Sequence, residues 1–377
     1  MSDILSLYTS EYVRIVAIVL AGLLFVQLFY ILFFYLRFVL YRDKGEDTEE
    51  PPVSVIITAR DEAHNLERFL ESVLTQDYPH YEVIVVDHAS TDETKFLLKR
   101  ISEKYNHLYV TSIPYSSESN HSKKLALIIG IKAAKNDVML FTDADCEPAS
   151  KEWIRKMVRH FDPDTHIVLG YGAYKPRKGL LDKWIRLDTA FIAMQYFGFA
   201  LSGLPYMGVG RNMAWRKSFF NSTDGFDKHI YEPSGSDDLF VNHNANKRNT
   251  KIEISPESFT YSLQPEKWKY WFVQKDRHMG SAKFYKFKYK VLLTLEPLTR
   301  ILFFATAIYL ALIHPLWQVP AIAFAIREFF MFLIWAFGLR KLKEKRIFVW
   351  AFVYDKLQPV VNVLVYLFTS NKRKAWK

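Results

Sequence analysis

Residues 138–145 read Val-Met-Leu-Phe-Thr-Asp-Ala-Asp, and this stretch decides the fold class. A short apolar run that ends in acidic residues is typical of a buried strand reaching the edge of its sheet. We therefore predict a strand over Val138–Thr142. Asp143 and Asp145 follow it, so their carboxylates can converge on one divalent cation. Mg²⁺ or Mn²⁺ prefers such hard oxygen ligands, with a diphosphate completing the shell. Alone, an Asp-x-Asp pair is more often a solvated turn.

Strand and helix patterns alternate upstream of this pair. Apolar runs predict three further strands, over Val53–Thr58, Glu82–Asp87 and His107–Ile113. Helical spacing predicts helices over Leu66–Leu74, Asp92–Tyr105 with Asp92 as N-cap, and Lys123–Lys135. Such alternation predicts an α/β fold with a mostly parallel sheet wrapped by helices. Ligands of these sheets bind beyond the carboxyl ends of the strands, where the acidic residues stand.

Both ends of the chain are strongly apolar. Ile15–Leu36 is broken only by Gln27 and is long enough to cross a membrane. Ile301–Ile313 and Ala321–Leu339 predict a hairpin around His314-Pro315. Polar residues interrupt Ile347–Phe368, which favours an interfacial or re-entrant helix. We therefore expect an N-terminal transmembrane anchor (1–42), a polar linker (43–52), a soluble domain (53–290) and C-terminal transmembrane or interfacial helices (291–377).

Charge suggests the partners and the orientation. The 377 residues carry a formal net charge of +10, which suits a nucleotide diphosphate, a lipid phosphate or a phospholipid surface. Nucleic acid is not predicted, because no helix-turn-helix, zinc-finger or RNP pattern is present. The single cysteine excludes an intramolecular disulfide and a cysteine-based zinc site. Basic residues follow the first span and flank the tail segments, at Arg37, Arg42, 283–290 and 340–346, so these loops are predicted to be cytoplasmic. Asn371–Lys377 is basic too, which disfavours a crossing by the last segment.

Polar residues at the first two strand ends are candidate nucleotide-sugar ligands. Thr58, Arg60 and Glu62 follow the first strand, and Asp87 ends the second. Asp87 either forms a turn or helix cap, or accepts hydrogen bonds from a nucleobase or ribose. Lys123 begins a predicted helix and either reaches a diphosphate or is simply solvated there.

Two later motifs also carry chemistry. Asp237 and Asp238 follow Ser236, a good N-cap, so both acids fall in the first turn of a helix. They either stabilise the helix dipole or supply a general base for an acceptor hydroxyl. Gln274–His278 follows an aromatic run and reads as a basic amphipathic helix at a membrane surface. Alternatively, the planar guanidinium group of Arg277 pairs with a diphosphate.

In their order along the chain, these motifs resemble family 2 glycosyltransferases of the GT-A fold over residues 51–280. The residues that carry the resemblance are Val53–Ile57, Asp87 with Asp92, Lys123, Asp143-Ala144-Asp145, Gly225-Phe226, Asp237-Asp238 and Gln274 with Arg277. Each motif is weak, but the ordered set is strong. The resemblance implies a nucleotide-sugar donor, a divalent metal and inversion at the anomeric carbon.

The resemblance also implies individual roles. Asp87 resembles the acid that binds the nucleotide base. Asp143 resembles a residue that contacts the donor, and Asp145 resembles the principal metal ligand. The Asp237-Asp238 pair resembles the Glu-Asp pair that supplies the base, and the position of Phe240 favours Asp237. Gln274 and Arg277 match Gln-x-x-Arg-Trp, near the acceptor and the diphosphate.

The chain departs from the family pattern at several positions. His88 and Ala89 replace a common Asp and Gly, Ser236 replaces a common acid, and His278 replaces the Trp expected in processive polysaccharide synthases. Residues 180–199 and 207–212 line the acceptor site in the family. For most of 180–199, however, a plain core helix is the simpler interpretation.

The predicted activity is metal-dependent transfer of a sugar to a hydroxyl of a lipid-linked saccharide or lipid at the cytoplasmic face of the cell membrane. One alternative is a processive synthase that extrudes polymer along Arg327, Glu328, Asp355 and Lys356. Another is a non-catalytic membrane scaffold with a decayed site.

Overall fold

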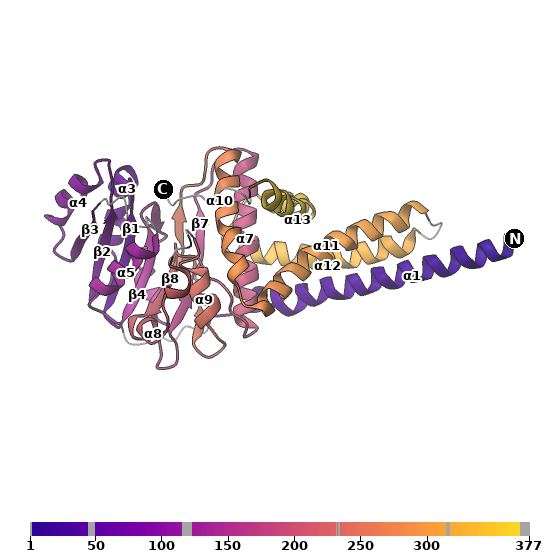
Figure 1. Cartoon of the computed structure of the whole chain (residues 1–377), viewed down its shortest axis with the longest axis horizontal. Coiled ribbons are helices and arrows are strands. Elements are labelled where there is room, and N and C mark those ends of the chain that lie inside the picture. The colour runs from indigo at the N-terminus through magenta and orange to yellow at the C-terminus, as the bar shows by residue number, and fades with distance from the viewer. Residues whose placement is uncertain are drawn as a thin grey trace.

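The computed structural model describes residues 2–43, 50–114, 123–230, 232, 234–313 and 317–369. The predicted turn at His314-Pro315, the central part of the predicted linker (44–49) and the basic end Asn371–Lys377 lie outside the described residues. Figure 1 shows a domain built on a sheet at one end of the molecule and long helices extending from it.

A seven-stranded sheet with the order β3-β2-β1-β4-β8-β6-β9 forms the centre of the soluble domain. Its parallel half consists of β1 (Val53–Ala59), β2 (Tyr81–His88), β3 (Leu108–Ile113) and β4 (Val138–Asp143). The other half consists of β8 (Met213–Arg216), antiparallel to β4, then β6 (Ile167–Leu169) and β9 (Thr250–Ile252). The four predicted strands are confirmed, and β1 is buried along its whole length, as its continuous apolar sequence requires.

A second, three-stranded sheet stands beside the first. It has the order β5-β10-β7, with β5 (Cys146–Pro148), β10 (Thr260–Ser262) and β7 (Gly172–Tyr174). Strands of three residues are too short to show a period-two pattern, so the sequence does not reveal them. Because β5 begins one residue after Asp145, this sheet fixes the direction in which the chain leaves the acidic pair.

Helices cover both faces of the larger sheet. One face is covered by α3 (Ala63–Leu74), α4 (Thr94–Ser102) and α6 (Trp153–Val158). On the other, α5 (Lys123–Ala133) packs against β1 and β2. A Cβ at Gly130 would lie 2.7 Å from the Ile56 side chain, so α5 approaches β1 closely. The short helices α8 (Lys217–Asn221) and α9 (Asp238–Asn244) flank the antiparallel half.

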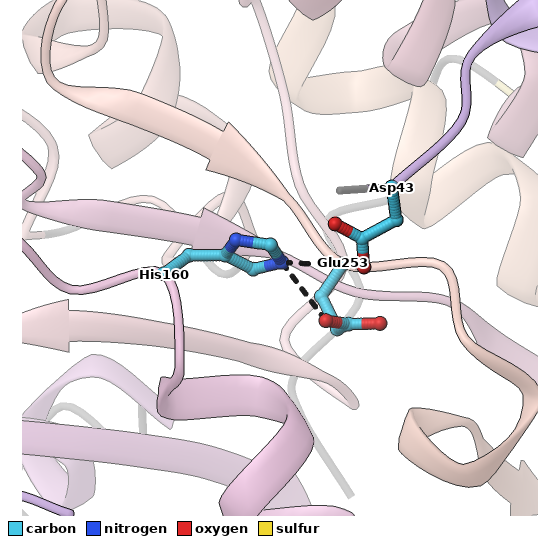
Figure 2. Close-up of side chains that lie close together, drawn as sticks. All are labelled: Asp43, His160 and Glu253. Atoms are coloured by element: carbon cyan, nitrogen blue, oxygen red, sulfur yellow. Dashed lines mark hydrogen bonds and ion pairs between the residues drawn. The ribbon is translucent and has the colours of Figure 1, made fainter. Parts of the chain in front are cut away.

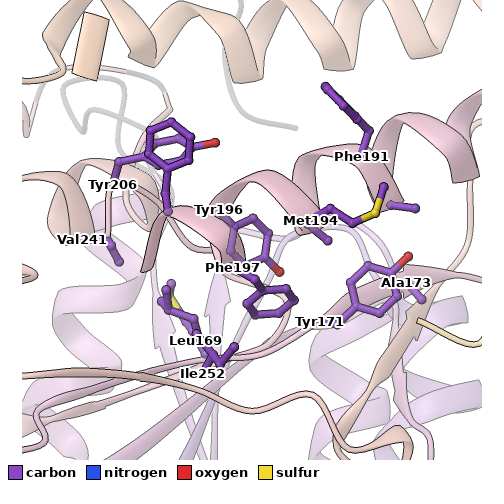
Figure 3. Packing of buried hydrophobic residues seen from close by; sticks show 14 of the residues in the cluster. Leu169, Tyr171, Ala173, Phe191, Met194, Tyr196, Phe197, Tyr206, Val241 and Ile252 are labelled. Carbon is purple, nitrogen blue, oxygen red and sulfur yellow. The ribbon is translucent and has the colours of Figure 1, made fainter. Parts of the chain in front are cut away.

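Helix α7 (Leu180–Leu201) separates the sheet from the membrane helices. Its Tyr196 hydroxyl donates to the Gly170 carbonyl at 2.7 Å, and Figure 3 shows Tyr196 and Phe197 on the strand side of the helix with Phe191 on the other. The Phe191 ring lies 5.8 Å from that of Trp335 in α12. The interpretation of residues 180–199 as a core helix is therefore confirmed.

Four helices among the described residues are long and apolar enough to span a membrane. They are α1 (Ser2–Phe29), which continues through Leu40, α11 (Phe287–Ile313), α12 (Gln318–Lys341) and α13 (Phe348–Thr369). In Figure 1, α1, α11 and α12 extend away from the sheets, whereas α13 is seen nearly end-on beside α7 and α10 (Trp268–Gly280). Helix α13 is continuous over 22 residues, and the interfacial or re-entrant placement of 347–368 stays a prediction.

Charged residues of the tail helices form a buried network. Arg327 of α12 donates to Asp355 of α13 at 2.7 and 3.1 Å, and Arg300 of α11 donates to the same carboxylate at 3.1 Å. Glu328 forms ion pairs with Arg327 and Lys356. The four residues considered for a polymer path are therefore bound to one another, and they join α11, α12 and α13.

Replacing Asp355 by Asn is expected to destabilise the packing of the tail helices. Arg300 and Arg327, each 1% exposed, would lose the carboxylate that they share. Leaving buried charges uncompensated costs about 3–5 kcal/mol. We expect a lower thermal midpoint for the detergent-solubilised protein. The control is Asp224→Asn, which removes an exposed ion pair with Lys228 and is expected to leave the midpoint unchanged. Equal midpoints for both variants would contradict the network.

Candidate active site

The parallel strands bring three predicted residues to one sheet edge. Thr58 stands opposite Asp143 in the pairing of β1 with β4, and Ala59 stands opposite Asp87 in the pairing of β1 with β2. The carboxyl ends of β1, β2 and β4 therefore meet in one row. Asp87 is buried and accepts a hydrogen bond from the Ser90 amide at 3.3 Å, so it does form a turn. That bond uses one carboxylate oxygen and leaves a nucleotide role compatible with the geometry.

The loops after β1 and β2 are tied together. Asp61, at φ 53°, accepts from the Thr91 amide at 2.7 Å. The Asp92 carboxylate accepts from the amides of Ala63 and Thr94, the first residues of α3 and α4, and so ties the two helix starts together. The cap position of α4 is Glu93, so the prediction of Asp92 as N-cap is wrong. Ala89 also has a positive φ of 54°, a conformation that glycine adopts more easily.

Arg60 and Glu62 belong to the first of these loops. The Glu62 carboxylate accepts from the Asn65 side chain at 2.5 Å, and its amide donates to the Thr94 hydroxyl at 3.0 Å. Glu62 therefore helps to fix the start of α3. Both residues lie next to the strand edge that carries Asp87, and their predicted contacts with the donor remain a prediction.

The acidic pair is held by neighbours from two other elements. Asp143, the last residue of β4, forms an ion pair with Lys123 at the start of α5. Asp145 accepts a hydrogen bond from the Ser262 hydroxyl of β10 at 2.7 Å. Lys123 is only 23% exposed, so the interpretation of a solvated helix start is wrong.

The electrostatics of the pair favour a bound cation. Burial raises the pKa of Asp143, but the charge and hydrogen bond of Lys123, together with the charges of Arg211 and Arg277, keep the pKa below its usual value. Burial, followed by the charge of Asp143, raises the pKa of Asp145. Two carboxylates thus crowd one buried position. Their oxygens fit a Mg²⁺ or Mn²⁺ ion, and both side chains keep oxygens that Lys123 and Ser262 do not use.

Arg211 falls in the segment 207–212 that the family resemblance places at the acceptor site, but the sequence assigned it no role of its own. It lies in the loop before β8, donates to the Gly172 carbonyl at 3.0 Å, and stacks over the Tyr174 ring at 4.2 Å. Its charge acts on both Asp143 and Asp145. A single arginine in a loop has no periodicity or spacing that would mark it. Only the packing of this loop on β7 brings Arg211 to the acidic pair.

The two acids of the base motif have different surroundings. Helix α9 begins at Asp238 with Asp237 at the cap position, so the prediction of Ser236 as N-cap is wrong. Asp237 is half-buried and accepts from the Gly210 amide at 2.7 Å. Asp238 is 7% exposed and accepts from the hydroxyls of Ser281 at 2.5 Å and Tyr285 at 2.7 Å. Burial and the charge of Asp237 raise the pKa of Asp238 to about 6.

A small pocket connects the acidic pair with the base motif. Its lining residues are Lys123, Leu127, Phe141, Thr142, Asp143, Gly210, Met213, Trp215, Ser236 and Asp237. Asp143 and Asp237, which are distant in sequence, therefore face the same space. The hydroxyl of Thr142 is buried and has no hydrogen-bond partner among the described residues. A polar group with no partner is what a ligand-binding position can satisfy.

Helix α10 contributes the two remaining predicted residues. The Gln274 amide donates to the Tyr174 hydroxyl at 3.1 Å, and the Arg277 charge acts on Asp143 and Lys123. At the other end of the helix, the first turn of α10 exposes aromatic side chains: Trp268 is 38% exposed and Tyr270 is 55% exposed. The exposed aromatic side chains lie at the start of α10 and Arg277 lies near its end, and both interpretations of this segment stay predictions.

A second acidic cluster lies elsewhere. The potential ligand atoms of Asp43, His160 and Glu253 lie within 4.8 Å of one another. Figure 2 shows the three side chains close together. Arg159 forms ion pairs with both carboxylates, and His160 contacts Glu253 at 2.9 Å. These contacts already occupy oxygens of both carboxylates, and Arg159 offsets one of their two charges. The cluster therefore fastens the chain that leaves the first membrane helix to the soluble domain, and we assign it no metal.

Comparison with protein families identifies the class. Residues 54–223 match the model for glycosyl transferase family 2, and residues 139–367 match that for glycosyl transferase family group 2. The chain belongs to the family 2 glycosyltransferases and has their GT-A fold. The second match extends through the membrane helices, so the tail belongs to the family pattern as well.

Individual relatives are more distant. The chain is 26% identical over 244 residues to the probable glycosyltransferase YdaM of Bacillus subtilis, covering 61% of this chain and 54% of that protein. It is 23% identical over 217 residues to the poly-beta-1,6-N-acetyl-D-glucosamine synthase of Staphylococcus aureus, covering 57% and 50%. It thus spans about half the length of these relatives. The mannosyltransferase PcManGT of Pyrobaculum calidifontis, solved with GDP-Man and Mn²⁺, superposes with a TM-score of 0.59 at 19% identity, over 96% of this chain and all of that one.

Proposed function

We propose that this protein is a metal-dependent, inverting glycosyltransferase that moves a sugar from a nucleotide diphosphate to a hydroxyl of a lipid-linked saccharide or lipid. One observation carries the proposal: the pocket between β4 and α9 is lined by the metal-binding candidate Asp143, by Lys123 and by the base candidate Asp237. A donor and an acceptor hydroxyl need these groups within reach of one another.

Each group has a role in this reaction. Asp143 and Asp145 are the residues that hold Mg²⁺ or Mn²⁺, which when bound neutralises charge on the departing diphosphate. Lys123, Arg277 and Arg211 supply further positive charge for the diphosphate. Asp237 or Asp238 takes the proton of the acceptor hydroxyl as its oxygen attacks the anomeric carbon. Asp87 contacts the nucleoside at the neighbouring strand end, with Thr58, Arg60 and Glu62 in the adjoining loop.

The membrane helices support a lipid-borne acceptor. Helices α10 and α13 pack together beside the site, and exposed aromatic side chains of α10 suit the level of the headgroups. We propose that α13 lies in this interface. Lys341, at the end of α12, donates to the Phe38 carbonyl at 2.8 Å, so the basic end of α12 lies against the end of the first span. Positive charge at these ends supports a cytoplasmic catalytic domain in the cell membrane.

A donor screen tests the proposal. Purified protein is incubated with GDP-mannose, UDP-N-acetylglucosamine or other nucleotide sugars, Mn²⁺ or Mg²⁺, and membrane lipid extract. We expect release of nucleotide diphosphate and a labelled lipid product with one donor, and loss of both with chelator. Failure of every donor with every lipid fraction would contradict the proposal and leave the scaffold alternative.

The length of the product decides between transfer and processive synthesis. In the described tail, Arg327, Glu328, Asp355 and Lys356 bind one another, which favours transfer of a single sugar. A ladder of products on a gel would instead favour a synthase.

A further inference from the structure

Lys124, next to the lysine of the acidic pair, contacts a different part of the molecule. Its side chain is 1% exposed, and its ammonium donates to three backbone carbonyls: His229 at 2.8 Å, Glu232 at 2.7 Å and Ser234 at 2.7 Å. A lysine has three donors, so these bonds use its whole capacity. Burial lowers the pKa of Lys124 to about 8, which still leaves it mostly protonated at neutral pH.

The three carbonyls belong to the segment that leads into the base motif. It begins at the short 3₁₀ turn Asp227–His229 and ends three residues before Asp237, with Gly235 at a φ of +86° in between. The His229 carbonyl also accepts from the Glu232 amide at 3.0 Å, whereas Lys124 contacts all three carbonyls from α5. The path of this segment therefore depends on a helix far away in sequence.

Lys123 and Lys124 thus connect two parts of one site. Successive residues of a helix point about 100° apart, so they contact different neighbours. Lys123 reaches Asp143, and Lys124 reaches the loop that precedes Asp237. On the other side, Gly210 holds the Asp237 carboxylate. The start of α5 therefore sets the spacing between the acidic pair and the base motif.

We propose that Lys124 is a positioning residue that fixes the backbone at His229, Glu232 and Ser234, and with it the base, relative to the sugar donor held at Asp143 and Asp145. This role rests on the proposed function. Lys124 itself contacts neither substrate, since its three donors are occupied within the protein.

The test compares Lys124→Met with Lys132→Met, which alters an exposed lysine of the same helix. In Lys124→Met we expect kcat for sugar transfer to fall about 100-fold, because small displacements of reacting groups have effects of that size. The KM for the nucleotide sugar stays unchanged, because Lys123, Asp143 and Asp145 are intact. Lys132→Met is expected to behave like the original protein in both respects.

Hydrogen exchange provides a readout that does not require activity. Peptides covering residues 229–240 are expected to exchange faster in Lys124→Met, while peptides covering β4 keep their protection. If Lys124→Met does not fold, Lys124→Arg, which keeps charge and donors, takes its place and is expected to show a smaller change in the same peptides.

The outcomes separate the two proposals. Unchanged kcat and exchange in Lys124→Met would overturn the positioning role. So would a loss of protection throughout the domain together with a higher donor KM, since Lys124 would then only maintain the fold. Absence of transfer by the unmodified protein counts against the proposed function alone, and exchange at 229–240 still decides the role of Lys124.

Discussion

Replacing Asp145 by Asn is expected to abolish sugar transfer and to leave membrane insertion and folding intact. The variant keeps the size of the side chain and a hydrogen bond to Ser262, but removes one of the two charges available to a divalent cation. Loss of a group that stabilises developing charge typically lowers kcat by about 10²–10³-fold. The measurement is transfer of a labelled sugar at increasing Mn²⁺, and we expect the variant to need more metal for any residual activity.

Glu147→Gln is the matched control for Asp145→Asn. Glu147 lies two residues further along, in β5, and forms an ion pair with Lys175 away from the pocket-lining residues. Its replacement is expected to leave both the activity and the metal requirement unchanged. Full activity of Asp145→Asn at ordinary Mn²⁺ concentrations would refute the metal assignment.

Asn variants of the base pair are expected to produce the second large effect. Asp237 lines the pocket, whereas Asp238 is enclosed by Ser281 and Tyr285, so we expect Asp237→Asn to be the more damaging. Loss of a general base costs about 10²–10⁴-fold in rate. Affinity for the nucleotide diphosphate should not change in either variant, because the acidic pair is untouched. Full activity of both variants would exclude the pair as the base.

The pH profile identifies which acid is the base. A base must be deprotonated, so activity rises with pH as the group loses its proton. The pKa of Asp238 is about 6 because of burial and the charge of Asp237. If Asp238 were the base, Asp237→Asn would stay active. Its activity would then rise at a lower pH, because loss of the negative charge at position 237 lowers the pKa of Asp238. We expect instead that Asp237→Asn is inactive at every pH. The activity of Asp238→Asn should still rise with pH.

Much of the candidate site could be predicted because its residues stand at strand ends. Asp143 ends β4 and Asp87 is the last residue but one of β2, each after a readable apolar run, and parallel strands place their carboxyl ends at one edge. The resemblance to family 2 glycosyltransferases then connected this edge with Asp237, Asp238, Gln274 and Arg277. The individual roles of Arg211 and Lys124 were not predicted, because each acts through a contact with a segment distant in sequence.

By itself, the sequence determined the class of fold, the membrane segments and the acidic edge, since these follow from local apolar patterns and from the order of motifs. Only the tertiary structure decided that Lys123 pairs with Asp143, that Asp238 is enclosed while Asp237 faces the pocket, and that α13 is one continuous helix. It also decided that Arg300, Arg327 and Lys356 pair with Glu328 and Asp355 in the tail helices. The physical reason is that burial, ion pairing and hydrogen bonding depend on the three-dimensional neighbours of a side chain, which local periodicity does not specify.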